Sequence, residues 1–139
     1  DYKTRNNKMK NKLLIVASDY YKEITQNLIN GSLSKLKLKK KSATIIKVPG
    51  TFEIPVLISK NLKKYDGFIA LGCVIKGETP HFNFICNSTF ISLLNLSTKS
   101  NKPIGNGIIT ALTLSQAKKR SLIKGKEAAN AVLEIIKND

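Results

Sequence analysis

The sequence predicts an α/β fold in which a four-stranded parallel sheet is covered by helices on both faces. Short apolar runs rich in β-branched residues alternate with longer segments whose apolar residues recur at helical spacing. The run GFIALGCVI at 67–75 is apolar throughout, which is typical of a strand buried on both faces. Because strands that alternate with helices are joined by right-handed crossovers, we expect all strands to run parallel.

The first half of the chain contains two expected strands and two expected helices. The strands are KLLIVAS at 12–18 and ATIIKV at 43–48. A helix is expected at 22–37, because apolar residues recur there at helical spacing and a lysine run follows, which suits the negative end of a helix. A second helix is expected at 53–64, with Pro55 in its first turn, where proline is well tolerated.

The second half continues the same alternation. The strand at 67–75 precedes an expected helix at 81–98, and PIGNGIIT at 103–110 is the fourth expected strand. Thr113 is expected to cap a helix at 114–120, and a separate last helix is expected at about 125–137. These elements predict a flavodoxin-like three-layer sandwich.

The 139 residues suit one domain, expected at 12–139 after a polar, flexible lead-in at 1–11. The segment SDYYKEI after the first strand has no glycine, which argues against a flavodoxin-type phosphate loop for FMN. Asp19 is the only aspartate in this segment, and strand three ends in Val74-Ile75-Lys76 without one, which argues against a response-regulator receiver. Cys73 and Cys86 lack metal-site spacing, so buried thiols in a reducing cytoplasm are expected.

The formal charge of +15 raises the alternative of a basic RNA-binding protein. However, the 24 basic residues are 22 lysines and 2 arginines, and the lysines are scattered. Arginine is the usual reader of bases and phosphates, so a solvated, compositionally biased surface is the favoured interpretation. We expect no nucleic-acid partner. No apolar run approaches the roughly 18 residues of a membrane span, so no membrane partner is expected.

Polar residues gather where the expected strands end, at 18–21, 49–53, 75–81 and 110–112. In parallel sheets these carboxyl ends meet at one edge, where ligands bind. His81, the only histidine, lies at the start of a helix, where unpaired N–H groups favour an anion. An imidazole beside a phosphate suits acid–base catalysis, although a histidine here can also be a simple cap or core residue. Tyr20 can likewise simply pack, and Glu53 can simply complement the helix dipole.

Several stretches resemble the 6,7-dimethyl-8-ribityllumazine synthase family in sequence, order and spacing. They are VPGTFEIP at 48–55, ALGCVIKGETPHF at 70–82, PIGNGIIT at 103–110, and QAKKR and KGKEAA within 116–129. The resemblance implies condensation of 5-amino-6-(D-ribitylamino)uracil with 3,4-dihydroxy-2-butanone 4-phosphate, a step of riboflavin biosynthesis. It implies no cofactor and no metal.

The resemblance also implies residue roles. His81 matches the catalytic histidine of the family. Residues matching the ribitylaminouracil site are Tyr20, Thr51, Phe52, Glu53, Cys73, Val74, Ile75 and Asn106. Residues matching the butanone phosphate site are Glu78, Thr79, Arg120 and Lys124.

Four features depart from the family pattern. Asn106 replaces an aromatic residue that closes the site from a neighbouring subunit, Lys76 replaces a common arginine, and Pro80 stands where some members have a hydroxyl. The SLI stretch before Lys124 is shorter than the usual glycine-containing kink, in a region that influences assembly.

The resemblance further implies a cytoplasmic homo-oligomer, either a pentamer or a sixty-subunit shell, with active sites between subunits. Riboflavin synthase is a further expected partner. A lumazine or flavin carrier without activity is a second alternative to the enzyme. His81 and Arg120 argue against it, because a carrier needs neither a proton shuttle nor a phosphate clamp.

Overall fold

The computed structural model describes residues 11–138, so the expected lead-in at 1–11 lies outside the described residues except for Asn11. The elements follow in the order β1 (Leu13–Ser18), α2 (Lys22–Leu38), β2 (Thr44–Val48), η1 (Thr51–Glu53), α3 (Ile54–Lys60), β3 (Gly67–Ile75), η2 (Lys76–Glu78), α4 (Phe82–Ser100), β4 (Ile104–Ala111) and α5 (Leu114–Lys137). The predicted alternation of strands and helices is confirmed, and β3 has the predicted bounds.

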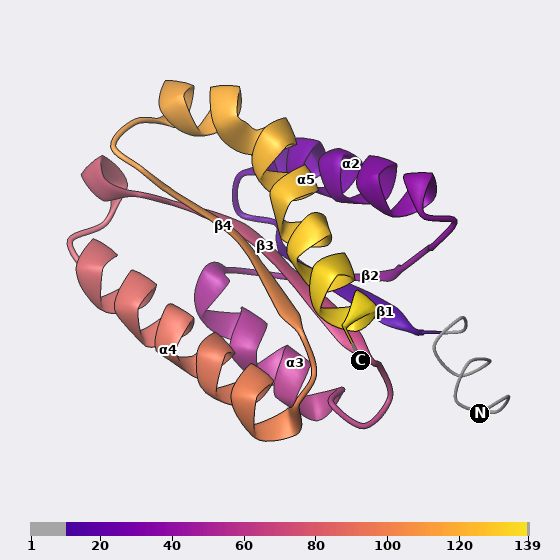
Figure 1. The fold of residues 1–139 in the computed structure, drawn as a ribbon. Coiled ribbons are helices and arrows are strands. Elements are labelled where there is room, and N and C mark those ends of the chain that lie inside the picture. The colour runs from indigo at the N-terminus through magenta and orange to yellow at the C-terminus, as the bar shows by residue number, and fades with distance from the viewer. Residues whose placement is uncertain (1–10, 139) are drawn as a thin grey trace, which may run out of the picture.

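The strands form one parallel sheet in the order β2-β1-β3-β4. Helices α2 and α5 cover one face of this sheet, and α3 and α4 cover the other (Figure 1). The protein is therefore a flavodoxin-like α/β sandwich, as predicted. Because all strands point the same way, their carboxyl ends share one edge.

Strand β3 separates the two halves of the core. Ile69 and Leu71 pack with α2 and α5 on one face, whereas Phe68 and Ala70 pack with α3 and α4 on the other. Every residue of β3 is buried. This burial on both faces explains why the segment is apolar without interruption.

The structure corrects the prediction of two helices at 114–120 and 125–137, because α5 is one continuous helix. Gly125 lies within it at a close approach to α2, where an added Cβ would lie 2.1 Å from the Leu28 carbonyl oxygen. This glycine therefore serves helix packing and does not end a helix. The predicted cap is confirmed, since the Thr113 side chain accepts a hydrogen bond from the Gln116 N–H at 3.2 Å.

The helix predicted at 53–64 is shorter in the structure. A 3₁₀ turn, η1, precedes it, and α3 ends at Lys60. Asn61 ends the helix, because its side-chain amide donates to the Leu57 carbonyl oxygen at 2.8 Å. Asparagine favours this position because its side chain competes for backbone groups. Pro55 lies in the first turn, as predicted.

Candidate active site

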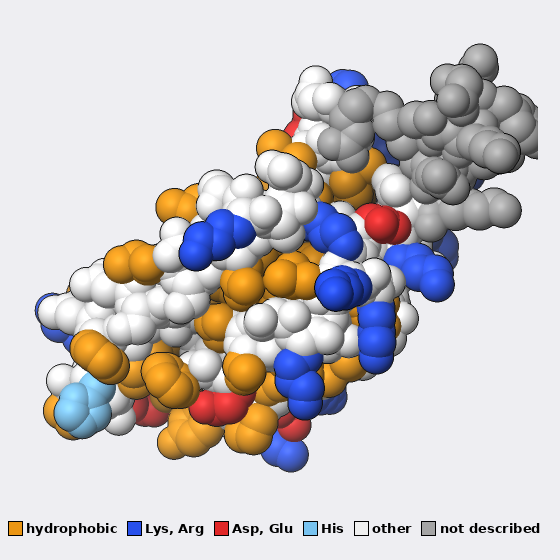
Figure 2. Space-filling view, turned by 90° about the horizontal axis from the view of Figure 1, so that it is seen from below, with side chains coloured by type: hydrophobic (Ala, Val, Ile, Leu, Met, Phe, Trp, Pro, Cys, Tyr) orange, Lys and Arg blue, Asp and Glu red, His pale blue; other side chains and the backbone are white. Residues whose placement is uncertain are grey.

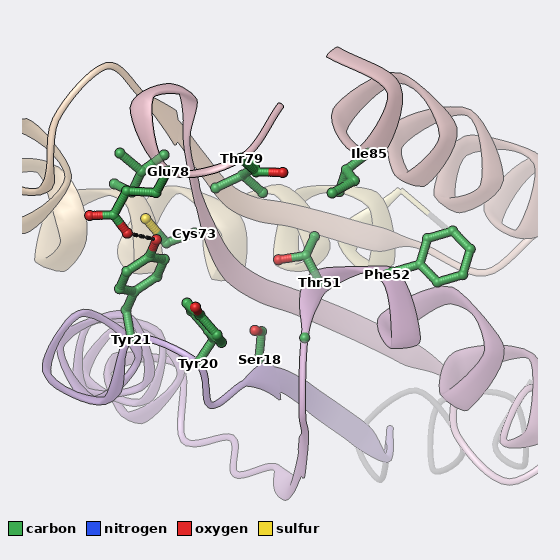
Figure 3. A pocket seen from close by; sticks show the side chains of 12 residues that line it. Ser18, Tyr20, Tyr21, Thr51, Phe52, Cys73, Glu78, Thr79 and Ile85 are labelled. Atoms are coloured by element: carbon green, nitrogen blue, oxygen red, sulfur yellow. Dashed lines mark hydrogen bonds between the residues drawn. The ribbon is translucent and has the colours of Figure 1, made fainter. Parts of the chain in front are cut away.

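A cavity of about 320 Å³ opens at the carboxyl edge of the sheet (Figure 3). Its lining comes from the carboxyl ends of β1 and β3, from the segments that follow β1, β2 and β3, and from one side chain of α4. The lining residues are Ser18, Tyr20, Tyr21, Gly50, Thr51, Phe52, Cys73, Val74, Ile75, Glu78, Thr79 and Ile85. This is the edge where the sequence predicts a ligand site.

Eight of the predicted site residues line this one cavity. They are Tyr20, Thr51, Phe52, Cys73, Val74, Ile75, Glu78 and Thr79. The parallel sheet explains this convergence, because β1 and β3 are paired neighbours and β2 lies directly beside β1. Three segments that are far apart in sequence thus end side by side.

Tyr21 and Glu78 join two sides of the cavity. The Tyr21 hydroxyl donates a hydrogen bond to Glu78 Oε2 at 2.5 Å (Figure 3). Burial and this bond raise the pKa of Tyr21 above its ordinary value, so the phenol keeps its proton. The Tyr20 ring packs edge-on against Tyr21 with 4.9 Å between ring centroids, while 72% of Tyr20 stays exposed. An exposed aromatic face at a cavity mouth is suited to stacking on a planar ligand.

Cys73 lies on the buried side of the cavity. Burial, and then the negative charge of Glu78, raises the pKa of its thiol to about 12, although the nearby Arg120 charge opposes the shift. The Cys73 side chain is therefore a neutral thiol near neutral pH. A thiol in this state is a poor nucleophile and acts as a small apolar wall.

His81 lies just outside the cavity lining, at the N-terminal end of α4. Its side chain is exposed and makes no capping hydrogen bond, whereas its backbone N–H donates to Thr79 Oγ1 at 3.2 Å. The imidazole is therefore neither a satisfied core residue nor a helix cap. It stands at one edge of the face shown in Figure 2, beside hydrophobic side chains.

Arg120 and Lys124 lie one turn apart on α5. Because α5 is continuous, this i, i+4 spacing places both cations on the same side of the helix. Arg120 is exposed, and its Nη1 donates to the Thr110 carbonyl oxygen at 3.4 Å, at the end of β4. Neither cation lines the cavity, although the charge of Arg120 reaches Cys73 within it.

Glu53 and Asn106 also lie outside this cavity. Glu53 lines a second hollow between α3 and α4, of about 310 Å³, whose rim it shares with Phe52. Asn106 lies in the middle of β4, paired with Ala70 and exposed on the edge strand of the sheet. Its Oδ1 accepts a hydrogen bond from the Ile108 N–H at 3.0 Å.

Four residues that line the cavity were given no binding or catalytic role from the sequence, namely Ser18, Tyr21, Gly50 and Ile85. For Ser18 and Tyr21 a signal was present, because both belong to the segment that ends the first strand. Gly50 belongs to the break after the second strand. Only Ile85 had no local signal, because its position depends on how α4 packs.

Two features are absent from residues 11–138, the part of the chain that the structure describes. In this range no three His, Cys, Asp or Glu side chains are grouped so that they could hold a metal ion. None of the helices described combines the length and apolar character needed to cross a membrane.

The fold and cavity define a flavodoxin-like α/β protein with a cavity at the carboxyl edge of its parallel sheet. Comparison with known families then identifies its family. A sequence model of 6,7-dimethyl-8-ribityllumazine synthase matches residues 10–139, so the chain belongs to that family.

Individual relatives agree with this assignment. The chain is 44% identical to a 6,7-dimethyl-8-ribityllumazine synthase of Blochmanniella pennsylvanica, over 91% of this chain and 87% of the relative. It is 41% identical to that of Buchnera aphidicola subsp. Baizongia pistaciae, over 96% and 90%. It is 37% identical to that of Protochlamydia amoebophila, over 98% and 84%. Almost the whole chain is thus similar to synthases of comparable length.

Proposed function

We propose that this protein is a 6,7-dimethyl-8-ribityllumazine synthase and that residues 12–139 form its functional domain. It would condense 5-amino-6-(D-ribitylamino)uracil with 3,4-dihydroxy-2-butanone 4-phosphate, with release of phosphate and water. Such a reaction transfers a four-carbon unit, so the enzyme is a transferase. The observation that carries the proposal is the convergence of the family's motifs at 48–55 and 70–82 on one cavity of suitable size.

The cavity offers the chemistry that a ribitylaminouracil needs. The exposed Tyr20 ring provides a face on which the pyrimidine can stack. The carboxyl end of β3, at Cys73–Ile75, provides backbone groups beside the ring. Thr51 adds a hydroxyl, and Glu53 lies beyond Phe52 in the adjoining hollow, where its carboxylate can accept hydrogen bonds from the ribityl chain.

The butanone phosphate would bind where β3 leads into α4. The unpaired backbone N–H groups at the start of a helix favour an anion. The first turn of α4 contains no acidic side chain that would repel one. Arg120 and Lys124 supply positive charge from α5, and a guanidinium can bind phosphate oxygens through two parallel hydrogen bonds. The Tyr21 hydroxyl donates a hydrogen bond to the Glu78 carboxylate, which orients this negative group toward Tyr21 beside the proposed anion site.

His81 is the proposed catalytic residue. Imine formation requires proton transfers between the attacking amine and the carbonyl oxygen, and phosphate loss and ring closure require further transfers. An imidazole can carry protons both ways near neutral pH. The absence of a side-chain capping bond leaves the His81 ring available for this work.

We further propose that the protein is a homo-oligomer, a pentamer or a larger shell, with sites shared between subunits. Large apolar side chains are exposed on the face of α3 and α4 shown in Figure 2. Val56 is 58% exposed, and on α4 Phe84, Ile91 and Leu94 are 60–68% exposed at spacings of seven and three residues. A stripe of this kind is typical of a surface that another protein covers. Asn106, exposed on β4, would then contribute to a neighbouring site.

A cytoplasmic location and an association with riboflavin synthase belong to the same proposal. Both follow from the family assignment and have their own tests, namely fractionation of cells and co-purification of the two proteins.

The proposed reaction is tested by mixing the purified protein with both substrates and following lumazine fluorescence. A blank without protein is needed, because the condensation also proceeds slowly unaided. We expect an acceleration that requires both substrates. Sedimentation of the same sample tests assembly, since a pentamer has five times the 15.4 kDa mass of one chain. A folded, assembled sample that gives no acceleration would refute the proposed function.

A further inference from the structure

Ser18 carries a buried hydroxyl that has no hydrogen-bond partner among the described residues. The residue is 2% exposed, and its Oγ is one of the few buried side-chain polar atoms left unpaired. Its backbone carbonyl is satisfied, because it accepts a hydrogen bond from the Thr25 hydroxyl. A buried hydroxyl without a partner is uncommon, since it loses its bonds to water and gains none in return.

Ser18 and Thr51 both belong to the wall of the cavity. They pack closely around Gly72 on the neighbouring strand, because an added Cβ there would lie 3.3 Å from the Ser18 Cβ and 3.0 Å from Thr51 Oγ1. Two hydroxyl-bearing side chains, one from the end of β1 and one from η1, thus lie near each other in this wall. Figure 3 shows Ser18 near Tyr20 and Thr51 along this wall.

We propose that Ser18 is a further substrate-binding residue, whose Oγ pairs with a polar edge atom of the pyrimidine ring. A pyrimidinedione edge presents both carbonyl oxygens and N–H groups, and a serine hydroxyl can donate to the first or accept from the second. The proposal rests on the proposed function, because that function supplies a pyrimidine. The phosphate is the poorer candidate partner, since the cations of α5 and the first turn of α4 lie at other parts of the site.

The Ser18 hydroxyl lies just beneath the cavity surface, so a ligand atom reaches it only if the wall yields slightly. Tyr20 is the least constrained part of that wall, being 72% exposed and only two residues away. A ring that stacks on the ligand and shifts as it does so would open the hydroxyl to the pyrimidine edge.

The test compares Ser18→Ala with the wild type in steady-state kinetics and in calorimetric binding of 5-amino-6-(D-ribitylamino)uracil. Loss of one neutral hydrogen bond predicts a roughly three- to tenfold rise in the KM and Kd for this substrate. The bond forms in the ground state and in the transition state, so kcat should stay unchanged. The KM for the butanone phosphate should not change.

Ser32→Ala is the matched control. Ser32 is also a buried serine, but its Oγ donates to the Gly125 carbonyl oxygen at 2.8 Å, between α2 and α5 and away from the cavity. We expect this control to lose stability and to keep both KM values. Ser18→Ala should keep or gain stability, because it removes an unpaired hydroxyl.

Unchanged KM and Kd for the pyrimidine in Ser18→Ala would overturn the proposal, as would equal rises in the KM of both substrates. Wild-type protein that binds the pyrimidine without catalysing condensation would refute the proposed function alone, and the calorimetric comparison would still decide the role of Ser18. Wild-type protein that binds no pyrimidine would refute both.

Discussion

Replacing His81 by alanine should separate catalysis from stability. The imidazole is exposed and makes no capping bond, so its loss should change the free energy of unfolding by less than about 0.5 kcal/mol. A positioned acid–base group contributes roughly 10²- to 10⁴-fold to a rate, and the slow unaided condensation sets a floor. We therefore expect turnover to fall roughly ten- to ten-thousandfold, which corresponds to about 1.4–5.5 kcal/mol of barrier.

The assay measures lumazine fluorescence at saturating concentrations of both substrates, with the blank rate subtracted. Asn83→Ala is the matched control, because Asn83 is also exposed and lies two residues away in the first turn of α4. The control should keep turnover close to that of the wild type. Sedimentation of both variants checks that any loss of rate does not come from failed assembly.

A His81→Ala turnover within twofold of the wild-type value would refute the catalytic role. So would an equal loss in Asn83→Ala, because the effect would then belong to the start of α4 as a whole. A variant that dissociates into single chains while Asn83→Ala stays assembled would show that His81 acts through subunit contacts.

Three further predictions follow from the site and its support. Arg120→Ala should raise the KM for butanone phosphate at least tenfold, and equal effects on both substrates would contradict the clamp. The pKa of the Cys73 thiol in the folded protein is about 12, above the ordinary value of 9, so this thiol stabilises the fold fully below pH 9. Cys73→Ala should therefore make the free energy of unfolding fall less steeply as the pH rises above 9. The contribution of the wild-type thiol should decline by about 1.4 kcal/mol per pH unit between pH 9 and 12. Urea unfolding of the wild type and of Cys73→Ala across this pH range measures the difference. Gly125→Ala should cost roughly 1–3 kcal/mol in the same assay, because its Cβ would lie 2.1 Å from the Leu28 carbonyl oxygen, whereas the exposed Lys126→Ala should cost almost nothing.

The sequence predicts the sheet well because burial on both faces leaves a strong local signal. In β3 every residue is buried, so the apolar run and the strand have the same bounds, Gly67–Ile75. The helix boundaries are less predictable. Glycine within a helical pattern commonly indicates a helix break, but Gly125 instead allows the backbone of α2 to pack closely against α5. That contact joins residues far apart in the chain, so the local sequence does not predict it.

The features of the site likewise divide into those that the sequence predicts and those that it does not. Residues at strand ends, such as Thr51 and Ile75, can be assigned to the cavity because a parallel sheet brings those ends together. The state of individual groups cannot be predicted locally. Whether the Ser18 hydroxyl has a partner, and whether Tyr21 reaches Glu78 across 57 residues, depends on side chains that only the folded chain brings near.

The residues that miss the cavity share a different property, which bears on assembly. Glu53, His81, Asn106, Arg120 and Lys124 were assigned roles from the family resemblance, and none of them lines the cavity at the carboxyl edge of a single chain. In a single chain His81 and Arg120 would therefore be exposed to solvent just outside the cavity lining. A second copy covering the apolar stripe of α4 would both bury that stripe and bring residues of its own to the open side of the cavity. Activity and assembly should therefore be lost together. In a dilution series, condensation should cease at the protein concentration where the sedimenting mass falls to that of one chain. A fully active monomer would show that one chain completes the site alone.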